Sequence, residues 1–191
     1  GNDCICVLEW LWSRPALTCF DAFFKFYPQG KNMSIKVGDR IPSVSLFHMT
    51  ADGPAQVSTD DIFSGKKVVF FVIPGAFTPT CSAEHLPGYV NNADAIRAKG
   101  VESIVCVSVN DPFVMAAWGE AQNVGDKVSL YSDPGDFVKA VGMELDLGEA
   151  GLSVRSSRYS MIVDDGVVTV LNDEDGPGFE ISSAEHLLTQ L

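Results

Sequence analysis

Hydrophobic and polar residues follow two kinds of pattern from about residue 36 onward. Continuous apolar runs bounded by glycine or proline are typical of buried strands, and they occur at 67–73 and 101–109. Between these runs, residues 80–99 repeat apolar side chains at a helical spacing. Pro87 should bend this helix, and Gly100 is well placed to end it. The pattern predicts a strand, a helix and a second strand.

Helix starts are predicted at three later points of the chain. Asp111-Pro112 and Asp133-Pro134 each place an acidic N-cap before a proline, which suits the first helical position. A third strand is expected at 128–131, between these two helices. The pattern Ser182-x-x-Glu185 resembles a capping box ahead of a final helix.

The final strands are predicted to form a hairpin. Residues 159–163 and 167–171 flank Asp165-Gly166, a strong signal for a two-residue turn. Helices between the earlier strands imply parallel crossovers, whereas the hairpin adds an antiparallel pair. We therefore expect an α/β fold with a mixed central sheet and helices on both faces.

Residues 1–32 differ in composition from the rest of the chain. They hold Cys4, Cys6 and Cys19 among five cysteines, and they show no clear period. Glu9 interrupts the apolar stretch, so the segment is a poor secretory signal. We expect a non-catalytic extension, either a weak presequence or sequence upstream of a native start at Met33. Residues 33–191 then form one compact domain.

Charge and composition exclude several classes of partner. The formal net charge is -12, and no cluster of lysine or arginine exists, so nucleic acid and anionic membrane surfaces are unsuitable partners. The longest apolar run, 68–73, is too short to cross a bilayer. An odd cysteine count argues against a secreted disulfide framework. We expect a cytoplasmic protein, or an organellar one such as mitochondrial if 1–32 is a presequence.

The segment 74–81 carries the predicted chemistry. It leaves the end of a central strand and places Cys81 in the first turn of a helix, where free N–H groups and the helix dipole favour a thiolate. The hydroxyl of Thr78 can accept a hydrogen bond from a hydroperoxide or donate one to the sulfur. Arg158, at the start of a predicted strand, is the candidate cation, and Arg155 is its nearest rival.

Two further residues have competing interpretations. His85 lies one helical turn after Cys81 and could act as its base, but we favour a helix residue that bonds locally. Cys106 lies in an apolar strand and could form a disulfide with Cys81, but we favour a buried core residue. No metal site is expected, because the histidines are scattered and there is no CxxC pair.

The motif Pro74-x-x-x-Thr78-x-x-Cys81 resembles the peroxiredoxin signature. Its surroundings, and the segments 108–114 and 158–161, are similar to the peroxiredoxin-5 or type II subfamily. The resemblance runs from about residue 36 to 191. It implies a thioredoxin-like fold, hydroperoxide reduction without a cofactor, and a homodimer. It also implies that Pro74, Thr78, Cys81 and Arg158 occupy the active-site positions.

The resemblance further implies how the reaction cycle closes. Plant type II members have a cysteine spacing similar to that of Cys81 and Cys106, whereas the cysteine-free segment 178–191 departs from animal members. We expect a thiol-dependent peroxidase of antioxidant defence, whose Cys81 sulfenic acid is reset by glutathione with glutaredoxin or by thioredoxin. The alternatives are a non-enzymatic redox sensor or chaperone that uses Cys81 as a switch, and a cysteine hydrolase.

Overall fold

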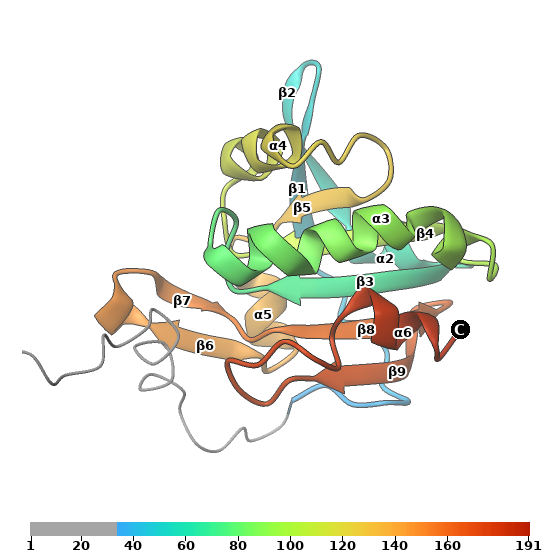
Figure 1. The fold of residues 1–191 in the computed structure, drawn as a ribbon. Helices are drawn as coiled ribbons and strands as arrows, with labels where there is room; N and C mark the ends of the chain where they lie inside the picture. Colours follow the sequence, from blue (N-terminus) through green and yellow to red (C-terminus); the bar gives the residue numbers. More distant parts are fainter. Residues whose placement is uncertain (1–33) are drawn as a thin grey trace, which may run out of the picture.

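A seven-stranded mixed sheet forms the centre of the computed structural model, which describes residues 34–191 (Figure 1). The strand order is β2-β1-β5-β4-β3-β8-β9. These strands are β1 (Ser45–Thr50), β2 (Gly53–Ser58), β3 (Lys67–Ile73), β4 (Ser103–Ser108), β5 (Ser129–Ser132), β8 (Tyr159–Asp164) and β9 (Val167–Asp173). The predicted extension 1–32 lies outside the described residues.

Helices connect most of these strands, and a short ribbon projects from the sheet. The helices are α2 (Thr59–Phe63), the π-helical turn η1 (Cys81–His85), α3 (Leu86–Arg97), α4 (Pro112–Ala121), α5 (Asp136–Ala140) and α6 (Ala184–Leu188). The ribbon consists of β6 (Glu144–Leu147), the 3-10 turn η2 (Gly148–Ala150) and β7 (Ser153–Ser156). The predicted fold class is confirmed.

Strand β3 lies near the middle of the sheet, and its neighbours run in opposite directions. It pairs in parallel with β4 and antiparallel with β8, and Val68 to Ile73 are all buried. A strand covered on both faces has no need for polar residues, which explains its continuous apolar run. Val72 pairs with Tyr159, so the residue before Tyr159 lies beside the carboxyl end of β3.

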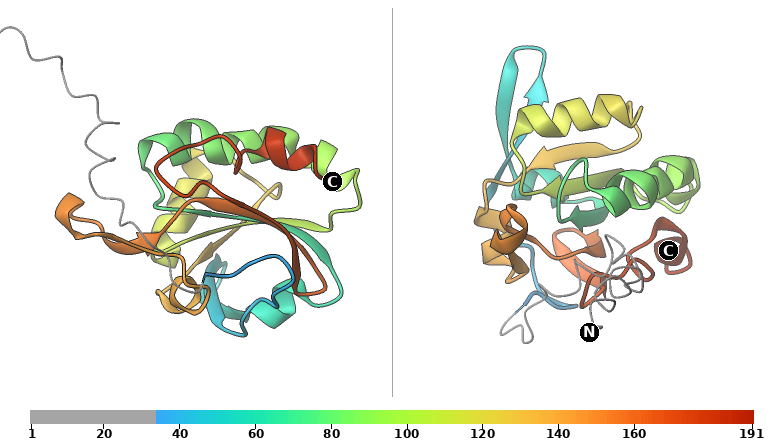
Figure 2. Two further views of the ribbon diagram at one scale, coloured as in Figure 1. Left: turned by 90° about the horizontal axis from the view of Figure 1, so that it is seen from below. Right: turned by 60° about the vertical axis from the view of Figure 1, so that its left-hand side comes forward.

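Alternate residues of β3 enter two separate cores. Helices α3, α4 and α6 cover one face of the sheet, where Phe71 and Ile73 pack. Helices α2 and α5 cover the other face, where Phe70 and Val72 pack. The view from below in Figure 2 shows α3 and α6 on one side of the sheet and α2 on the other. The prediction of helices on both faces is therefore confirmed.

One predicted turn and one predicted helix cap agree with the structure. Asp165 and Gly166 have φ angles of 47° and 77°, the left-handed conformation that a two-residue hairpin requires. Asp111 is the N-cap of α4, and its side chain accepts a hydrogen bond from the Val114 amide at 2.8 Å. These local signals depend only on neighbours in sequence, so they could be predicted from it.

Two other caps differ from prediction. The N-cap of α5 is Gly135, although the Asp133 carboxylate still accepts hydrogen bonds from the amides of Phe137 and Val138. The predicted capping box at Ser182 is wrong by one residue, because Ser183 is the N-cap of α6 and bonds the amide of His186. The hydroxyl of Ser182 instead donates to the carboxylate of Glu174, eight residues earlier in the loop before α6.

The edge hairpin β1–β2, the short helix α2 and the ribbon β6–β7 were not predicted from the sequence. Strand β2 lies at the edge of the sheet with β1 beside it, and both are only partly covered, so neither has the continuous apolar run of a central strand. Within residues 34–191, no helix has both the length and the apolar character needed to span a bilayer.

Replacing Asp133 by alanine is expected to lower the free energy of unfolding by about 2 kcal/mol. The buried carboxylate accepts hydrogen bonds from the amides of Gly135, Phe137 and Val138, and all three would lose this partner. Urea denaturation measures the change. The exposed Asp136→Ala is the control and should cost less than about 0.5 kcal/mol. Equal effects of the two substitutions would contradict this account of the turn.

Candidate active site

The turn between β3 and η1 is held by hydrogen bonds to its own backbone and to a neighbouring loop. The amide of Ala76 donates to the side-chain oxygen of Asn110 at 2.9 Å. Phe77 has a φ of 60°, which is uncommon for a bulky residue. The amide of Ser82 donates to the carbonyl of Thr78 at 3.1 Å. These contacts lead the chain from the sheet into the helix at Cys81.

Cys81 is fully buried and opens a π-helical turn rather than a regular α-helix. The amide of Leu86 bonds the carbonyl of Cys81, five residues earlier. Pro87 follows at once and has no amide hydrogen to continue an α-helical ladder backwards, so the predicted bend takes the form of a widened turn. The sulfur therefore lies at the amino-terminal end of a helix, as predicted.

Arg158 reaches the sulfur from the loop between β7 and β8. Its Nη2 donates to Cys81 Sγ at 3.3 Å, and its Nη1 contacts His85 Nδ1 at 2.9 Å. The residue is only 6% exposed. No carboxylate of residues 34–191 forms an ion pair with it, so the sulfur is the one acidic group that the guanidinium contacts within this part of the chain.

His85 bridges two segments that are distant in sequence, so the expectation of local bonding is wrong. Its Nε2 lies 3.1 Å from the carbonyl oxygen of Ser182, and its Nδ1 faces Arg158. An arginine can only donate and a carbonyl can only accept, so the ring carries its hydrogen on Nε2. Burial lowers the pKa of His85 well below its ordinary value, and the charge of Arg158 lowers it further, against the opposing effect of the Ser182 hydrogen bond.

Arg155, the other candidate for the cation beside the sulfur, hydrogen-bonds backbone carbonyl groups. Its Nε donates to the carbonyl of Leu152 at 2.8 Å and its Nη1 contacts the carbonyl of Pro74 at 3.5 Å. A side chain added at Gly75 would meet Arg155 and Thr78 at 3.1 Å each. Arg155 therefore supports the turn, whereas Arg158 contacts the sulfur.

Thr78 uses its hydroxyl hydrogen within the turn. Its Oγ1 donates to the carbonyl of Gly75 at 2.7 Å, so the hydrogen is not directed at the sulfur. The oxygen lone pairs remain available to accept a hydrogen bond. Of the two roles predicted for this hydroxyl, the geometry favours acceptance from a substrate.

Pro74 is buried directly after β3 and begins the turn.

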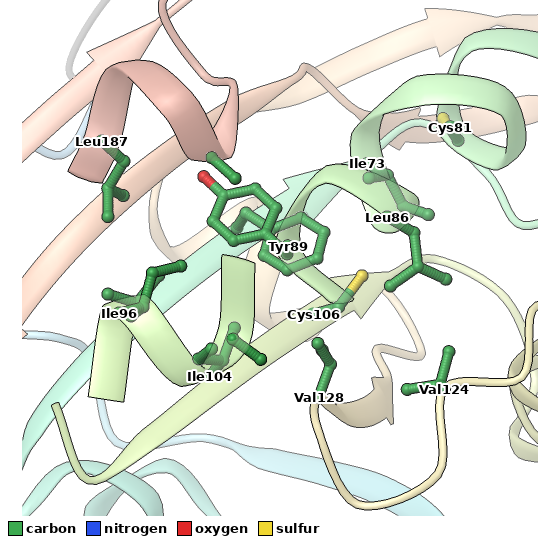
Figure 3. Packing of buried hydrophobic residues seen from close by; sticks show 14 of the residues in the cluster. Ile73, Cys81, Leu86, Tyr89, Ile96, Ile104, Cys106, Val124, Val128 and Leu187 are labelled. Atoms are coloured by element: carbon green, nitrogen blue, oxygen red, sulfur yellow. The ribbon is translucent and has the colours of Figure 1, made fainter. Parts of the chain in front are cut away.

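Cys106 is fully buried among apolar side chains of β4 and its neighbours, within the same core cluster as Cys81. In the view of Figure 3, Ile73 and Leu86 lie between the two sulfurs. Both cysteines are free thiols. Burial raises the pKa of the Cys106 thiol well above its ordinary value, the proximity of Cys81 raises it further, and Arg158 opposes the effect. The thiol of Cys106 is therefore kept protonated in this conformation.

The loop before α6 contacts His85 and Arg158 through Phe179 and Ser182, and the sequence analysis did not predict these contacts. Phe179 packs on His85 with ring centroids 5.0 Å apart, and its centroid lies 5.9 Å from the Arg158 guanidinium carbon. Tyr89 donates its hydroxyl to the same Ser182 carbonyl at 2.8 Å. These contacts join segments about 90 residues apart, for which a single sequence offers no signal. Among residues 34–191, no group of three or more potential ligands could hold a metal ion.

Comparison with known proteins identifies relatives along nearly the whole described chain. The Redoxin family model matches residues 36–188. Peroxiredoxin-2E-2, chloroplastic, from Oryza sativa is 49% identical over 164 residues, which cover 83% of this chain and 73% of that protein. Peroxiredoxin-2C from Arabidopsis thaliana is 43% identical over 159 residues, covering 82% of this chain and 98% of the relative.

Solved structures agree with this relationship. Reduced Prx3 from Vibrio vulnificus in complex with H2O2 superposes with a TM-score of 0.79 at 48% identity, covering 82% of this chain and 98% of that one. Peroxiredoxin 5 from Alvinella pompejana gives a TM-score of 0.72 at 35% identity, covering 81% and 96%. Family match, sequence identity and fold agree: the chain belongs to the redoxin family and is a peroxiredoxin, a thiol peroxidase with a thioredoxin-like fold.

Proposed function

We propose that Cys81 is the residue at which this thiol peroxidase attacks hydroperoxides, with Arg158, Thr78 and Pro74 forming the rest of its active site. The observation that carries the proposal is the 3.3 Å contact between the sulfur and a buried guanidinium that has no carboxylate partner in residues 34–191. A buried cation is costly unless an anion compensates it. A thiolate at Cys81 supplies this anion, and the thiolate is the nucleophilic form of cysteine.

The first step transfers one oxygen atom from the peroxide to the sulfur. The Cys81 thiolate attacks the terminal oxygen of the hydroperoxide, an S–O bond forms, and the O–O bond breaks. The leaving alkoxide or hydroxide takes up a proton to give an alcohol or water, and Cys81 becomes a sulfenic acid. Negative charge moves from sulfur onto the peroxide oxygens during this step. Arg158 stabilises that charge without having to reorient.

Thr78 and Pro74 act on the substrate and on the shape of the turn. The Thr78 oxygen, whose hydrogen is held by the Gly75 carbonyl, can accept the hydrogen of the incoming hydroperoxide. That bond would orient the peroxide beside the sulfur. Pro74 has a fixed φ and no amide hydrogen, so it starts the turn at a constant angle to β3.

Two reducing thiols return the enzyme to its starting state. The first attacks the sulfenic acid to form a mixed disulfide and water, and the second releases the Cys81 thiol as the disulfide of the reductant forms. We propose glutathione with glutaredoxin as the reductant, with thioredoxin as the alternative. One reactive cysteine suffices for this cycle, because Cys106 is buried and its thiol is kept protonated.

We also propose a homodimer and a two-part chain. Phe77 and Phe113 are 57% and 61% exposed, and aromatic side chains are enriched at the interfaces between subunits. Residues 1–32 precede the matched segment 36–188 and are proposed as a non-catalytic extension. A chloroplastic name for two relatives favours the organellar alternative for the location, while the cytoplasmic assignment stays a prediction.

Cys81→Ser is expected to abolish peroxide turnover while leaving the fold intact. A hydroxyl is nearly isosteric with a thiol but is a far weaker nucleophile at neutral pH. Coupled consumption of hydrogen peroxide, with each candidate reductant, measures the loss, and circular dichroism checks the fold. Appreciable turnover by a folded Cys81→Ser protein would refute the assignment. Wild-type protein that loses one thiol to peroxide but shows no turnover with any reductant would favour the sensor alternative.

Cys106→Ser is expected to keep turnover with glutathione and glutaredoxin but to lose about 1–3 kcal/mol of stability. The loss arises because a hydroxyl would be buried where a weakly polar sulfur had been. Peptide mass analysis of peroxide-treated wild type provides the second readout. A Cys81 peptide that has gained oxygen or glutathione supports the one-cysteine cycle. A Cys81–Cys106 disulfide would show instead that the turn η1 opens during each cycle and would favour thioredoxin.

Deleting residues 1–32 is expected to leave peroxidase activity and melting temperature nearly unchanged. The segment lies outside the family match, which begins at residue 36. Steady-state kinetics and thermal unfolding of the full and shortened chains provide the comparison. A fall of several degrees in melting temperature would show that the segment packs on the domain and is not a separable extension.

A further inference from the structure

We propose that Glu174 is a positioning residue for Arg158 and acts through the Ser182 carbonyl and His85. Glu174 touches neither the sulfur nor the guanidinium by its side chain, so this role is distinct from catalysis. The proposal rests on the function proposed above, in which Arg158 stabilises the Cys81 thiolate. It is carried by four consecutive sets of contacts that connect the carboxyl-terminal loop to the sulfur.

The first set shapes the loop between β9 and α6. One oxygen of the Glu174 carboxylate, Oε1, accepts hydrogen bonds from the Glu180 amide at 2.8 Å, the Ser182 amide at 2.7 Å and the Ser182 hydroxyl at 2.6 Å. Hydrogen bonds to a charged acceptor are stronger than those between neutral groups. Three of them on one atom fold residues 174–182 back upon themselves.

The second set uses the carbonyl that this loop presents. Ser182 is fully buried, and its carbonyl oxygen contacts His85 Nε2 at 3.1 Å and accepts the Tyr89 hydroxyl at 2.8 Å. His85 ends η1 and Tyr89 lies in the first turns of α3, and Figure 2 shows the segment after β9 running beside this part of the chain. The position of this carbonyl therefore depends on the Glu174 contacts at the same residue.

The third set determines which nitrogen of His85 holds the hydrogen. A carbonyl at Nε2 requires the hydrogen there and leaves Nδ1 as an acceptor, which faces Arg158 Nη1 at 2.9 Å. If the carbonyl moved away, the hydrogen could transfer to Nδ1. An N–H group would then face the guanidinium, and two donors repel each other. The Ser182 carbonyl thus selects the tautomer that can bind Arg158.

The fourth set aligns the guanidinium with the sulfur. Because a guanidinium is planar and rigid, a bond at Nη1 also fixes the direction of Nη2, which donates to Cys81 Sγ at 3.3 Å. Phe179, within the loop that Glu174 closes, covers both His85 and Arg158. The backbone amide of Glu174 also donates to the Arg158 carbonyl at 3.3 Å. Glu174 and Arg158 are therefore connected twice. One connection runs from Glu174 through Ser182 and His85 to Arg158 and is called the relay below, and the other is this backbone hydrogen bond.

Glu174→Ala and Glu174→Gln test the proposal in the full chain. Alanine removes the acceptor, so the rate constant for Cys81 with hydrogen peroxide should fall about tenfold. The pH profile of Cys81 alkylation by iodoacetamide should move to higher pH. Glutamine keeps an Oε1 acceptor for the same three donors and should retain most of both properties. Glu185→Ala is the matched control, because Glu185 belongs to the same terminal segment but bonds only Asn92 among the described side chains; it should leave both unchanged.

A double-mutant cycle with His85→Phe separates the relay from a general structural effect. Phenylalanine fills the ring position but cannot bond Arg158 or Ser182. If Glu174 acts through His85, adding Glu174→Ala to His85→Phe should change the alkylation profile no further. Additive effects would overturn the relay, as would a wild-type profile in folded Glu174→Ala.

A substitute variant and a readout that needs no peroxide ensure that the experiment can refute the relay. Should Glu174→Ala not fold, Glu174→Asp retracts the carboxylate by one methylene and keeps its charge, and the same criteria apply to it. Alkylation is measured without peroxide, so it tests the relay even if the chain shows no peroxidase activity. If wild-type Cys81 does not react with hydrogen peroxide, the proposed function is refuted. If the alkylation profile of these variants equals that of the wild type, only the relay is refuted.

Discussion

The burial of one positive charge that has no carboxylate partner within residues 34–191 organises this domain. Arg158 is 6% exposed, and within the described residues its guanidinium contacts a neutral imidazole, an aromatic ring and a sulfur. An arginine keeps its charge in proteins, so the cost of burial falls on the groups around it. The histidine is held neutral by the same environment, because its pKa is lowered by burial and by Arg158 itself. The remaining group in contact is the Cys81 sulfur, which accepts a hydrogen bond from Nη2 at 3.3 Å, and the proposed function assigns the compensating negative charge to it.

The sheet brings the members of this cluster together. Strands β3 and β8 are antiparallel, and the pairing of Val72 with Tyr159 places Arg158 at the end of β3 where the turn to Cys81 begins. Strand β9 then returns antiparallel to β8, and its carboxyl end delivers Glu174 and the terminal loop to the same corner. Three segments that are distant in sequence thus meet at one end of the sheet. This is the position at which reactive sites collect in open α/β folds.

The two described cysteines show how environment separates chemistry from packing. Both are fully buried and both belong to the same apolar cluster. Cys81 opens a helix and receives the Arg158 guanidinium, whereas Cys106 points from the middle of β4 into aliphatic side chains, as Figure 3 shows. Burial raises the pKa of the Cys106 thiol well above its ordinary value. At equal burial, one sulfur contacts a guanidinium at the start of a helix, a setting that favours a thiolate, whereas the other packs as a small hydrophobic group in a strand.

The sequence by itself determined the features that depend on neighbouring residues. The apolar run of β3, the cap at Asp111, the turn at Asp165-Gly166 and the placement of Cys81 in a first helical turn follow from local pattern and local hydrogen bonding. The motif around Cys81 also sufficed to predict the family. Arg158 could be named from its motif, but its distance from the sulfur could not, since that distance results from the register of β8 against β3.

Only the tertiary structure decided the rest of the site. In the folded domain the Ser182 hydroxyl donates to Glu174 and does not cap a helix. His85 contacts Arg158 and the Ser182 carbonyl, and not local partners. Phe179 packs on the ring of His85. Each of these contacts joins residues that no local rule relates. Their geometry depends on how the carboxyl-terminal loop closes over α3. A periodic pattern reports which face of an element is buried, whereas the partner that each buried polar atom finds depends on the packing of the whole domain.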